Sequence, residues 1–231
     1  MSSSPVAPTS PETLDFVGCL KAFTSDPGWL GKLLVGSLIT LVGCLILPLP
    51  LLIGYQFRVL KLSAAGAPRP FPEWEDWGGL FVDGLKVLAV MIPHQLALFA
   101  GVGLPIFAIM AVSGALGEER GGPFVLLLVL PLALVGVVAL VAFAVYIQAA
   151  LVRLVQTGDI AAAFQPAENV AFLKRNVTPL LLAFAVLLVT NTIAQFGMCL
   201  CYVGLIPTTL WSQLTFHYAL GQVARIDAAR R

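Results

Sequence analysis

The chain alternates long apolar runs with short polar segments. An α-helix needs about 20 apolar residues, at about 1.5 Å each, to cross the hydrocarbon core of a bilayer. The run at 49–62 is shorter because Arg58 and Lys61 interrupt it. It either spans, with both side chains reaching toward the headgroups, or re-enters the membrane. The pattern predicts six transmembrane helices, with apolar runs at residues 30–47, 49–62, 87–116, 124–152, 179–197 and 201–220.

The composition indicates that lipid is the solvent of this chain. Of 231 residues, 59% are hydrophobic and 11% are charged, compared with about 25% charged residues in soluble domains. Transmembrane strands would show alternating segments of about ten residues, and these runs do not alternate. We therefore expect an all-α integral membrane protein, built from helical hairpins with interfacial amphipathic helices on the cytoplasmic side.

Positive charge falls unevenly on the two sides of this arrangement. With an outer turn at residues 47–50, Arg120 is the one basic residue outside, next to Glu118 and Glu119. Joining the first two runs into one helix places, at best, ten basic residues against three. The positive-inside rule therefore favours six helices with cytoplasmic N- and C-termini. The basic residues predicted inside are Lys21, Lys32, Arg58, Lys61, Arg69, Lys86, Arg153, Lys174, Arg175, Arg225, Arg230 and Arg231.

The same pattern divides the chain into one domain and two tails. Residues 1–12 are rich in Ser and Pro and lack basic residues, which predicts a disordered tail rather than a signal peptide. Residues 13–224 form a single six-helix transmembrane domain in this interpretation. Residues 225–231 are expected to form a short basic tail.

Residues 71–86 are the most distinctive polar segment. At helical spacing, Trp74, Trp77 and Phe81 share one face, while Asp76 and Asp83 lie on the other. Such a helix lies in the headgroup plane and leads into the next transmembrane helix. It either fixes the depth of the helices, with its carboxylates neutralising nearby arginines and lysines, or forms a docking surface for a basic partner or a divalent cation.

This region also carries a family resemblance. The segments GYxxRVL at 54–60, PEWxxWGxLFxDGLK at 72–86, TGD at 157–159 and LKRN at 173–176 resemble a prokaryotic membrane family known as domain of unknown function 4013. The resemblance covers most of the chain from Phe16 to about Arg225. It implies a multi-span protein of the bacterial or archaeal cytoplasmic membrane with no assigned activity, so no functional residue can be transferred.

Within the predicted spans, no Asp, Glu, Lys or Arg lies near the bilayer centre. This absence argues against an ion-coupled pump and a voltage sensor, which depend on such groups. Milder polar residues form a candidate intramembrane face. They either make interhelical or local backbone hydrogen bonds, each worth about 0.6 kcal/mol, or line a polar cavity or an oligomeric pore. The candidates are Asn191, Gln195, Gln213, His217 and His94.

Cys44 is predicted near the outer membrane face, together with Cys199 and Cys201. Cys44 either pairs with one of the other two in an oxidising periplasm or all three are small packing residues. Two isolated histidines and no CxxC pair make a poor metal site. The sequence therefore predicts no metal and no other cofactor.

Two functional interpretations remain for this chain. Because no nucleophile–base pair, carboxylate pair or phosphate-binding loop is evident, we expect a protein that is not an enzyme. One interpretation is a non-catalytic membrane component, such as a scaffold, an assembly factor or a complex subunit. The alternative is a passive conduit or carrier for a lipid or small solute. Both predict contact with membrane lipids and either a homo-oligomer or partner membrane subunits, and the net charge of +1 argues against nucleic acid.

Overall fold

A computed structural model describes residues 13–42, 48–200 and 204–231 of the chain. Every regular element in these ranges is a helix, which confirms the predicted all-α class. Short π or 3-10 turns at Phe99–Gly103, Val125–Val129 and Phe196–Leu200 interrupt or extend the α-helices. The α-helices are α1 (Phe16–Ala22), α2 (Trp29–Val42), α3 (Leu49–Ala64), α4 (Trp77–Leu98), α5 (Leu104–Phe124), α6 (Leu130–Thr157), α7 (Ile160–Ala163), α8 (Pro166–Arg175), α9 (Val177–Gln195) and α10 (Leu205–Ala229).

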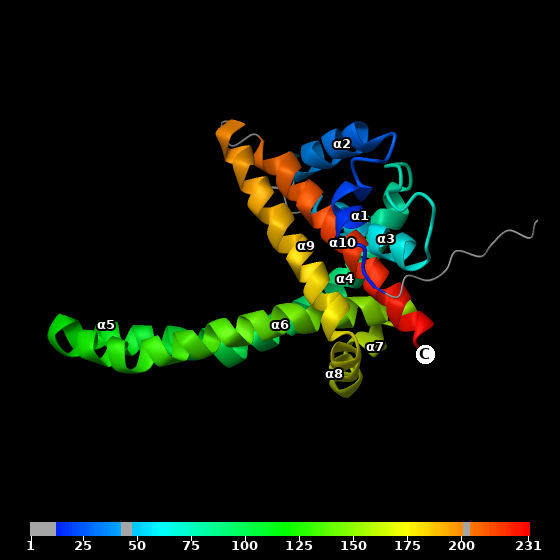
Figure 1. Cartoon of the computed structure of the whole chain (residues 1–231). Helices are drawn as coiled ribbons and strands as arrows, with labels where there is room; N and C mark the ends of the chain where they lie inside the picture. Colours follow the sequence, from blue (N-terminus) through cyan, green and yellow to red (C-terminus); the bar gives the residue numbers. More distant parts are fainter. Residues whose placement is uncertain (1–12, 43–47, 201–203) are drawn as a thin grey trace, which may run out of the picture.

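The molecule consists of a helical bundle and a long arm. Helix α10 packs against α1, α2, α3, α6 and α9, and α3 also packs along α4. Helix α4 continues through the π turn into α5, the backbone leaves helical geometry at Gly117 (φ 75°, ψ 172°), and the chain returns through α6, so that α5 and the first half of α6 extend away from the bundle (Figure 1). We call the hairpin of residues 92–143 the arm.

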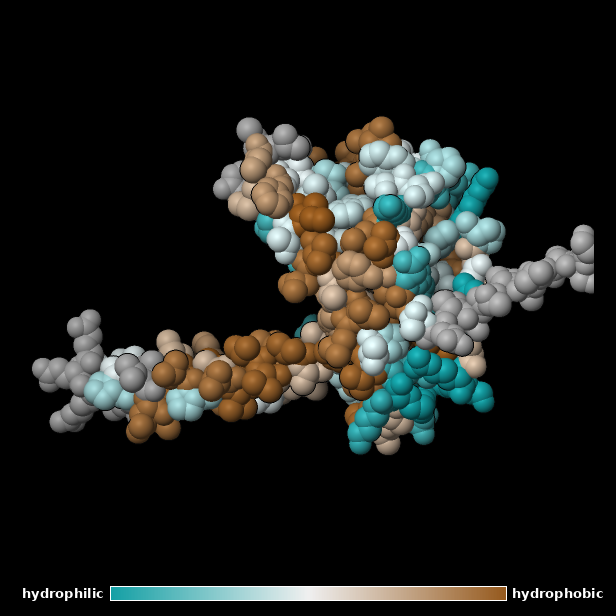
Figure 2. Space-filling model, in the orientation of Figure 1, coloured by the Kyte–Doolittle hydropathy of each residue, from teal (hydrophilic) through white to brown (hydrophobic). Residues whose placement is uncertain are grey.

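Three helical segments are long and apolar enough to cross a membrane. They are Trp77–Ala115 with 39 residues, Leu127–Thr157 with 31 and Val177–Cys199 with 23. Hydrophobic residues cover the arm and the visible side of α9, whereas hydrophilic residues gather around α8 (Figure 2). Helix α2 is apolar, and its described part, Trp29–Val42, is shorter than these three segments. Helix α10 is long but contains Ser, Thr, Gln and His. Because neighbouring helices surround α10, these polar side chains contact protein.

The last helix does not end where the sequence predicted a tail. Helix α10 continues to Ala229, and Ile226 and Asp227 are buried against the bundle. The basic residues at 225–231 favoured the prediction of a solvated tail, so the sequence did not indicate that the helix continues. The predicted N-terminal tail, residues 1–12, lies outside the described residues.

Helices α3 and α4 approach each other at two glycines. A Cβ atom at Gly54 would collide with the carbonyl oxygen of Leu80, and one at Gly84 would collide with that of Pro50. Close contact of this kind is the usual way in which membrane helices gain packing energy, because lipid offers no hydrophobic drive for helices to associate. The α3–α4 contact therefore depends on the absence of a side chain at Gly54 and at Gly84.

We expect Gly84→Ala to lower the free energy of unfolding by about 1–3 kcal/mol, because the new methyl group must push α3 away from α4. Thermal unfolding of the detergent-purified protein measures this change. Gly78→Ala is the matched control on the same helix, since a Cβ there meets no atom within 4 Å. Equal stability of the two variants would contradict the close-contact interpretation.

Candidate functional site

The aromatic residues of the segment 71–86 do not all lie on one helix. Trp74 precedes α4 and stacks on Tyr55, with ring centroids 4.0 Å apart, while its Nε1 donates to the Lys32 carbonyl at 3.0 Å. Trp77 begins α4 and is exposed, and Phe81 is half-buried. Trp74 thus fixes this segment to the bundle, and Trp77, which stacks against Trp74, is the one of the three aromatic residues classed as exposed.

The two predicted docking carboxylates already have partners. Asp76 accepts from the Gly79 amide at 3.0 Å as the N-cap of α4, and it pairs with Arg58 at 3.1 Å. The amide hydrogen bond and then Arg58 lower the pKa of Asp76. Asp83 is buried and lies 3.3 Å from Arg58, 3.7 Å from Lys61 and 3.6 Å from Lys86. Of the two alternatives, this geometry favours neutralisation of nearby cations over capture of a partner.

A second buried charge holds α2 in place. Lys32 is 4% exposed, and its Nζ contacts Asp26 at 2.9 Å, Glu73 at 3.0 Å and the Phe71 carbonyl at 2.7 Å. The sequence predicted only that Lys32 lies on the cytoplasmic side. The structure shows that it links α2 to the loop before α4.

The predicted polar face is divided among different surfaces. Asn191 and Gln195 are exposed on α9. The contact between α9 and α10 uses another pair, Thr190 and Ser212, whose hydroxyl oxygens are 2.8 Å apart. His94 donates from Nδ1 to the Val90 carbonyl at 2.7 Å, which agrees with the predicted backbone contact, and it stacks on Phe164.

Gln213 and His217 line a cavity of about 170 Å³ between α3, α4, α6 and α10. Gln56 and Gln148 contribute two further amides to it, so four polar side chains from three helices meet there. The Oε1 atom of Gln148 is buried and has no hydrogen-bond partner within the described part of the chain. Sequence reasoning missed the two additional glutamines, because their helices were judged by their apolar residues.

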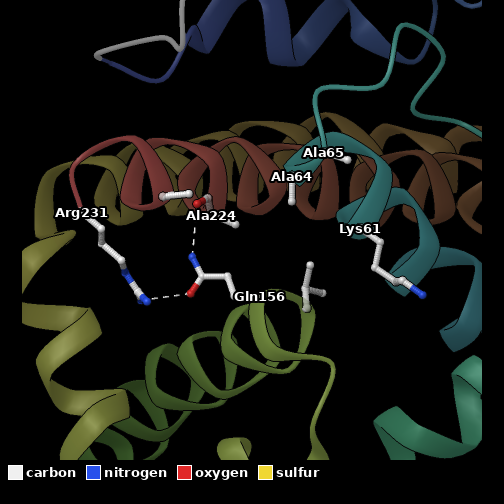
Figure 3. A pocket seen from close by; sticks show the side chains of 8 residues that line it. Lys61, Ala64, Ala65, Gln156, Ala224 and Arg231 are labelled. Atoms are coloured by element: carbon white, nitrogen blue, oxygen red, sulfur yellow. Dashed lines mark hydrogen bonds between the residues drawn. The ribbon is translucent and has the colours of Figure 1, made fainter.

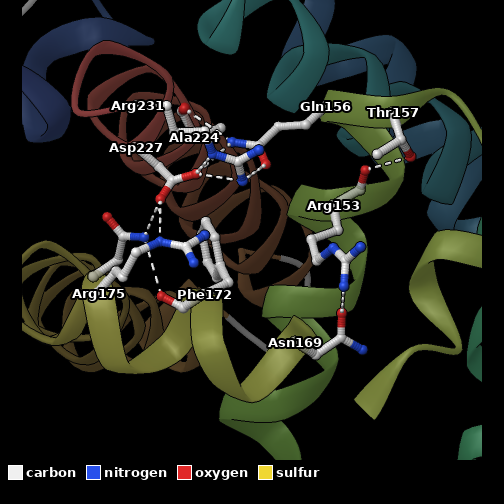
Figure 4. A network of polar contacts seen from close by, with 10 residues as sticks. Arg153, Gln156, Thr157, Asn169, Phe172, Arg175, Ala224, Asp227 and Arg231 are labelled. Atoms are coloured by element: carbon white, nitrogen blue, oxygen red, sulfur yellow. Dashed lines mark hydrogen bonds and ion pairs between the residues drawn. The ribbon is translucent and has the colours of Figure 1, made fainter. Parts of the chain in front are cut away.

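The ends of α6, α8, α9 and α10 meet around Asp227 (Figure 4). Its side chain is 2% exposed and accepts from Asn176 Nδ2 at 2.7 Å and from Gln156 Nε2 at 3.2 Å. Arg231 and Arg175 add ion pairs at 2.9 and 3.5 Å. Arg153 makes a separate link between α6 and α8, since it donates to Asn169 at 3.4 Å. Sequence reasoning missed this network because residues 225–231 were assigned to a tail.

Next to this network lies an open pocket of about 410 Å³ between the C-terminal ends of α3, α6 and α10 (Figure 3). Lys61 and Arg231 lie toward opposite ends of it, and Gln156 lies between them, where it accepts from Arg231 at 3.2 Å. The rest of the wall is small and apolar. The lining residues are Lys61, Ala64, Ala65, Val155, Gln156, Ala224, Ala228 and Arg231.

Two of the four cysteines lie in the described ranges, and neither is in a disulfide. Cys19 is buried, and burial followed by the nearby Asp15 carboxylate raises the pKa of its thiol to about 12. Cys199 is an exposed free thiol. Cys44 and Cys201, the other predicted disulfide residues, lie outside the described residues. No three His, Cys, Asp or Glu side chains of the described residues are grouped as metal ligands.

The Asp227 network predicts a pH-dependent stability. Burial opposes ionisation of this carboxyl, but hydrogen bonds from Asn176 and Gln156 and the charges of Arg231 and Arg175 outweigh it, so the pKa of Asp227 is lowered. A lowered folded-state pKa stabilises the fold above the unfolded-state value of about 4 and loses this contribution as the pH falls through the folded-state value.

We therefore expect Asp227→Asn to lower the free energy of unfolding by about 2 kcal/mol at pH 7, and this difference from the wild type to shrink as the pH falls below about 4. Thermal unfolding between pH 7 and pH 3 measures it. The control Glu75→Gln changes an exposed carboxylate and is expected to leave the profile unchanged. A stability difference between Asp227→Asn and the wild type that stays constant from pH 7 to pH 3 would show that ionised Asp227 does not stabilise the fold.

A comparison with known families gives one match. The family model described as protein of unknown function (DUF4013) matches residues 37–203, and no curated protein and no solved structure matches. The matched range includes both motifs of the segment 54–86 on which the sequence resemblance was based. Because the match covers well over half of the chain, this protein belongs to the family of unknown function DUF4013.

Proposed function

We propose that this protein is a non-catalytic, multi-pass component of a prokaryotic cytoplasmic membrane, a scaffold or complex subunit that associates with a second copy through its arm. In this proposal α2, α3, the α4–α5 segment, α6, α9 and α10 cross the membrane, and both termini are cytoplasmic. The observation that carries the proposal is the face of small residues on the exposed arm, Ala108, Ala111 and Ala115.

The arrangement of helix ends supports the proposed orientation. The C-terminal end of α3 lies along the second half of α10, where the Ser63 hydroxyl donates to the Tyr218 carbonyl at 2.7 Å, and Ala64 and Ala65 share a pocket with Ala224 and Ala228. Gln156 adds the end of α6, and Asn176 adds the start of α9. Six hairpin-connected crossings bring these ends to one side, and the clustered lysines and arginines there fit the cytoplasmic face.

Helix α3 is short for a membrane-spanning helix and needs adjustment of the bilayer or the helix. It contains 16 residues, which corresponds to about 24 Å at 1.5 Å per residue. A hydrocarbon core of about 30 Å exceeds this length, and membranes thin locally around short helices at modest cost. Arg58 and Lys61 near the end of α3 can extend toward the headgroups.

The arm presents apolar side chains on nearly all sides. In its two segments 6% of the most apolar window is buried, compared with 33% in α9. Phe107, Leu127 and Leu134 are 69%, 74% and 68% exposed. Lipid satisfies such side chains, so exposure alone does not distinguish an anchor from an interface.

One face of α5 favours a protein neighbour over lipid alone. Ala108, Ala111 and Ala115 are exposed and spaced by three and four residues, which places them on one side of the helix. Small residues in this pattern let a second helix approach closely. The arm of another copy carries the same face, so two arms can pack symmetrically.

To test this, cysteine is introduced at Ala111 in a variant whose native cysteines are replaced by alanine, and native membranes are treated with an oxidant. We expect a disulfide-linked dimer, and we expect Ala108→Leu in the same protein to reduce it several-fold. The control is Leu181→Cys, which is also at an exposed position, on α9. Equal dimer yields at positions 111 and 181 would indicate random collision and would refute the arm interface.

The polar cavity between α3, α4, α6 and α10 favours a second candidate function, a passive conduit for a small neutral solute. Its four polar side chains and the unpartnered Gln148 oxygen are the supporting observation. If the cavity conducts, Gln148→Leu combined with Gln213→Leu abolishes glycerol flux into proteoliposomes. Asn191→Leu, outside the cavity, is the control. Flux that equals that of empty liposomes in the wild type would exclude the conduit.

A further inference from the structure

We propose that the pocket at the ends of α3, α6 and α10 binds a phosphoethanolamine group, a phosphate monoanion joined through two carbons to a primary ammonium. Neither the family match nor the proposed scaffold role assigns a ligand to this pocket. The proposal rests on the proposed function only where the group belongs to a membrane lipid, because the pocket then lies at the cytoplasmic headgroup level.

The size and wall of the pocket suit a small headgroup. Its volume of about 410 Å³ falls within the usual range for ligand sites, about 300–1,000 Å³. Ala64 and Ala65 at the end of α3 and Ala224 and Ala228 on α10 line it. These methyl groups leave space for a ligand and offer apolar contact to the carbon atoms that join the two charges.

Lys61 is one of two cations available for the phosphate. Its side chain is 45% exposed, and its ion pair with Asp83 is long, at 3.7 Å. Asp83 keeps Arg58 at 3.3 Å and Lys86 at 3.6 Å when Lys61 moves away. Lys61 can therefore turn to a ligand without leaving a buried carboxylate unpaired.

Arg231 is the second cation. Within the described part of the chain it contacts Asp227 and Gln156 through Nε and Nη2. A guanidinium has five N–H donors in a planar fork, so Nη1 is left for a phosphate oxygen. Gln156 holds this guanidinium beside the pocket (Figure 3).

The charges of the side chains and helix ends around the pocket argue against a simple anion as its ligand. Five cations, Arg58, Lys61, Lys86, Arg175 and Arg231, pair with three carboxylates, Asp76, Asp83 and Asp227, which leaves an excess of two positive charges. Three helices, however, end at this pocket. Each C-terminal end carries about half a negative charge, so the helices offset most of the excess.

The two signs of charge come from different groups of the pocket wall. The positive charge is concentrated at Lys61 and Arg231, near opposite ends of the pocket, whereas the helix ends at Ala64–Ala65 and Val155–Gln156 carry the partial negative charge. A phosphate contacts one of the two cations, and the primary ammonium, two carbons away, donates to a carbonyl oxygen at a helix end. A zwitterion therefore fits better than a phosphate alone.

Native mass spectrometry of the detergent-purified full chain tests the proposal. Phosphatidylethanolamine is titrated beside phosphatidylglycerol, which lacks the ammonium, and phosphatidylcholine, whose quaternary ammonium cannot donate a hydrogen bond. We expect phosphatidylethanolamine to bind at least threefold more tightly than either of the others. Equal binding of the three lipids, or tighter binding of phosphatidylglycerol, would overturn the proposal.

Two variants test whether phosphatidylethanolamine binds at this pocket. Lys61→Gln removes a cation, and Ala228→Leu fills the pocket from an exposed position without changing any charge. Each is expected to weaken the binding of phosphatidylethanolamine at least threefold while the unfolding temperature stays within a few degrees of the wild type. Lys174→Gln, an exposed cation on α8 that does not line the pocket, is the control. Binding of phosphatidylethanolamine that stays at the wild-type level in both pocket variants would contradict the proposal.

An additional measurement distinguishes a lipid headgroup from a free phosphoethanolamine compound as the source of the bound group. Millimolar glycerophosphoethanolamine is added to the lipid-loaded protein. Displacement of the lipid assigns the site to the headgroup chemistry in free or lipid form, whereas retention with an intact lipid preference assigns it to the lipid. Both results support the pocket. Because the measurement uses detergent, its failure leaves the cross-linking of arms in membranes unaffected.

Discussion

The bundle depends on helix backbones that approach one another without intervening side chains. Helix α3 occupies the centre of this arrangement, since Gly54 and Gly84 bring α4 against one of its faces and Gly221 brings α10 against another, near Leu60 and Ser63. In lipid, helices gain little from burying apolar surface, so the dense contacts of close packing and a few interhelical hydrogen bonds hold them together. The Ser63–Tyr218 hydrogen bond forms where α3 and α10 are this close.

The close approach also determines how the charged residues are used. The cations near the ends of α3 and α10 lie beside carboxylates on neighbouring elements, and Asp83 and Asp227 become buried centres with several partners each. Removing one partner from such a centre costs little while the others remain. This redundancy allows Lys61 to serve a ligand, and it explains why the acidic segment near Trp77 offers less free charge than its sequence suggests.

Much of the helical content was predictable, because the composition left few alternatives and the runs are long. The arrangement in space was harder to predict. Residues 87–116 and 124–152 read as two ordinary spans, and no local periodicity indicates that they leave the bundle as an arm. Trp74 was placed on a helix because it follows the spacing of Trp77, but Pro72 precedes it and Asp76 starts the helix two residues later. For the site, the polar character of Gln213 and His217 was recognised, whereas their separation from Asn191 depends on helix rotation, which the apolar sequence of α9 does not specify.

In this protein the more hydrophobic helical segments are the less buried ones, because they form the arm, whereas the more polar helices lie in the bundle. The segment Leu127–Thr157 has the highest mean hydropathy of the three candidate spans, 2.9, and is among the least buried. Helix α10 is less hydropathic because it is enclosed by other helices, so its Ser, Thr, Gln and His side chains find protein partners or cavities. A membrane helix needs to be apolar only where lipid contacts it. The polar chemistry of this chain is therefore concentrated around α10, while the arm retains an apolar surface that suits contact with lipid and with another helix.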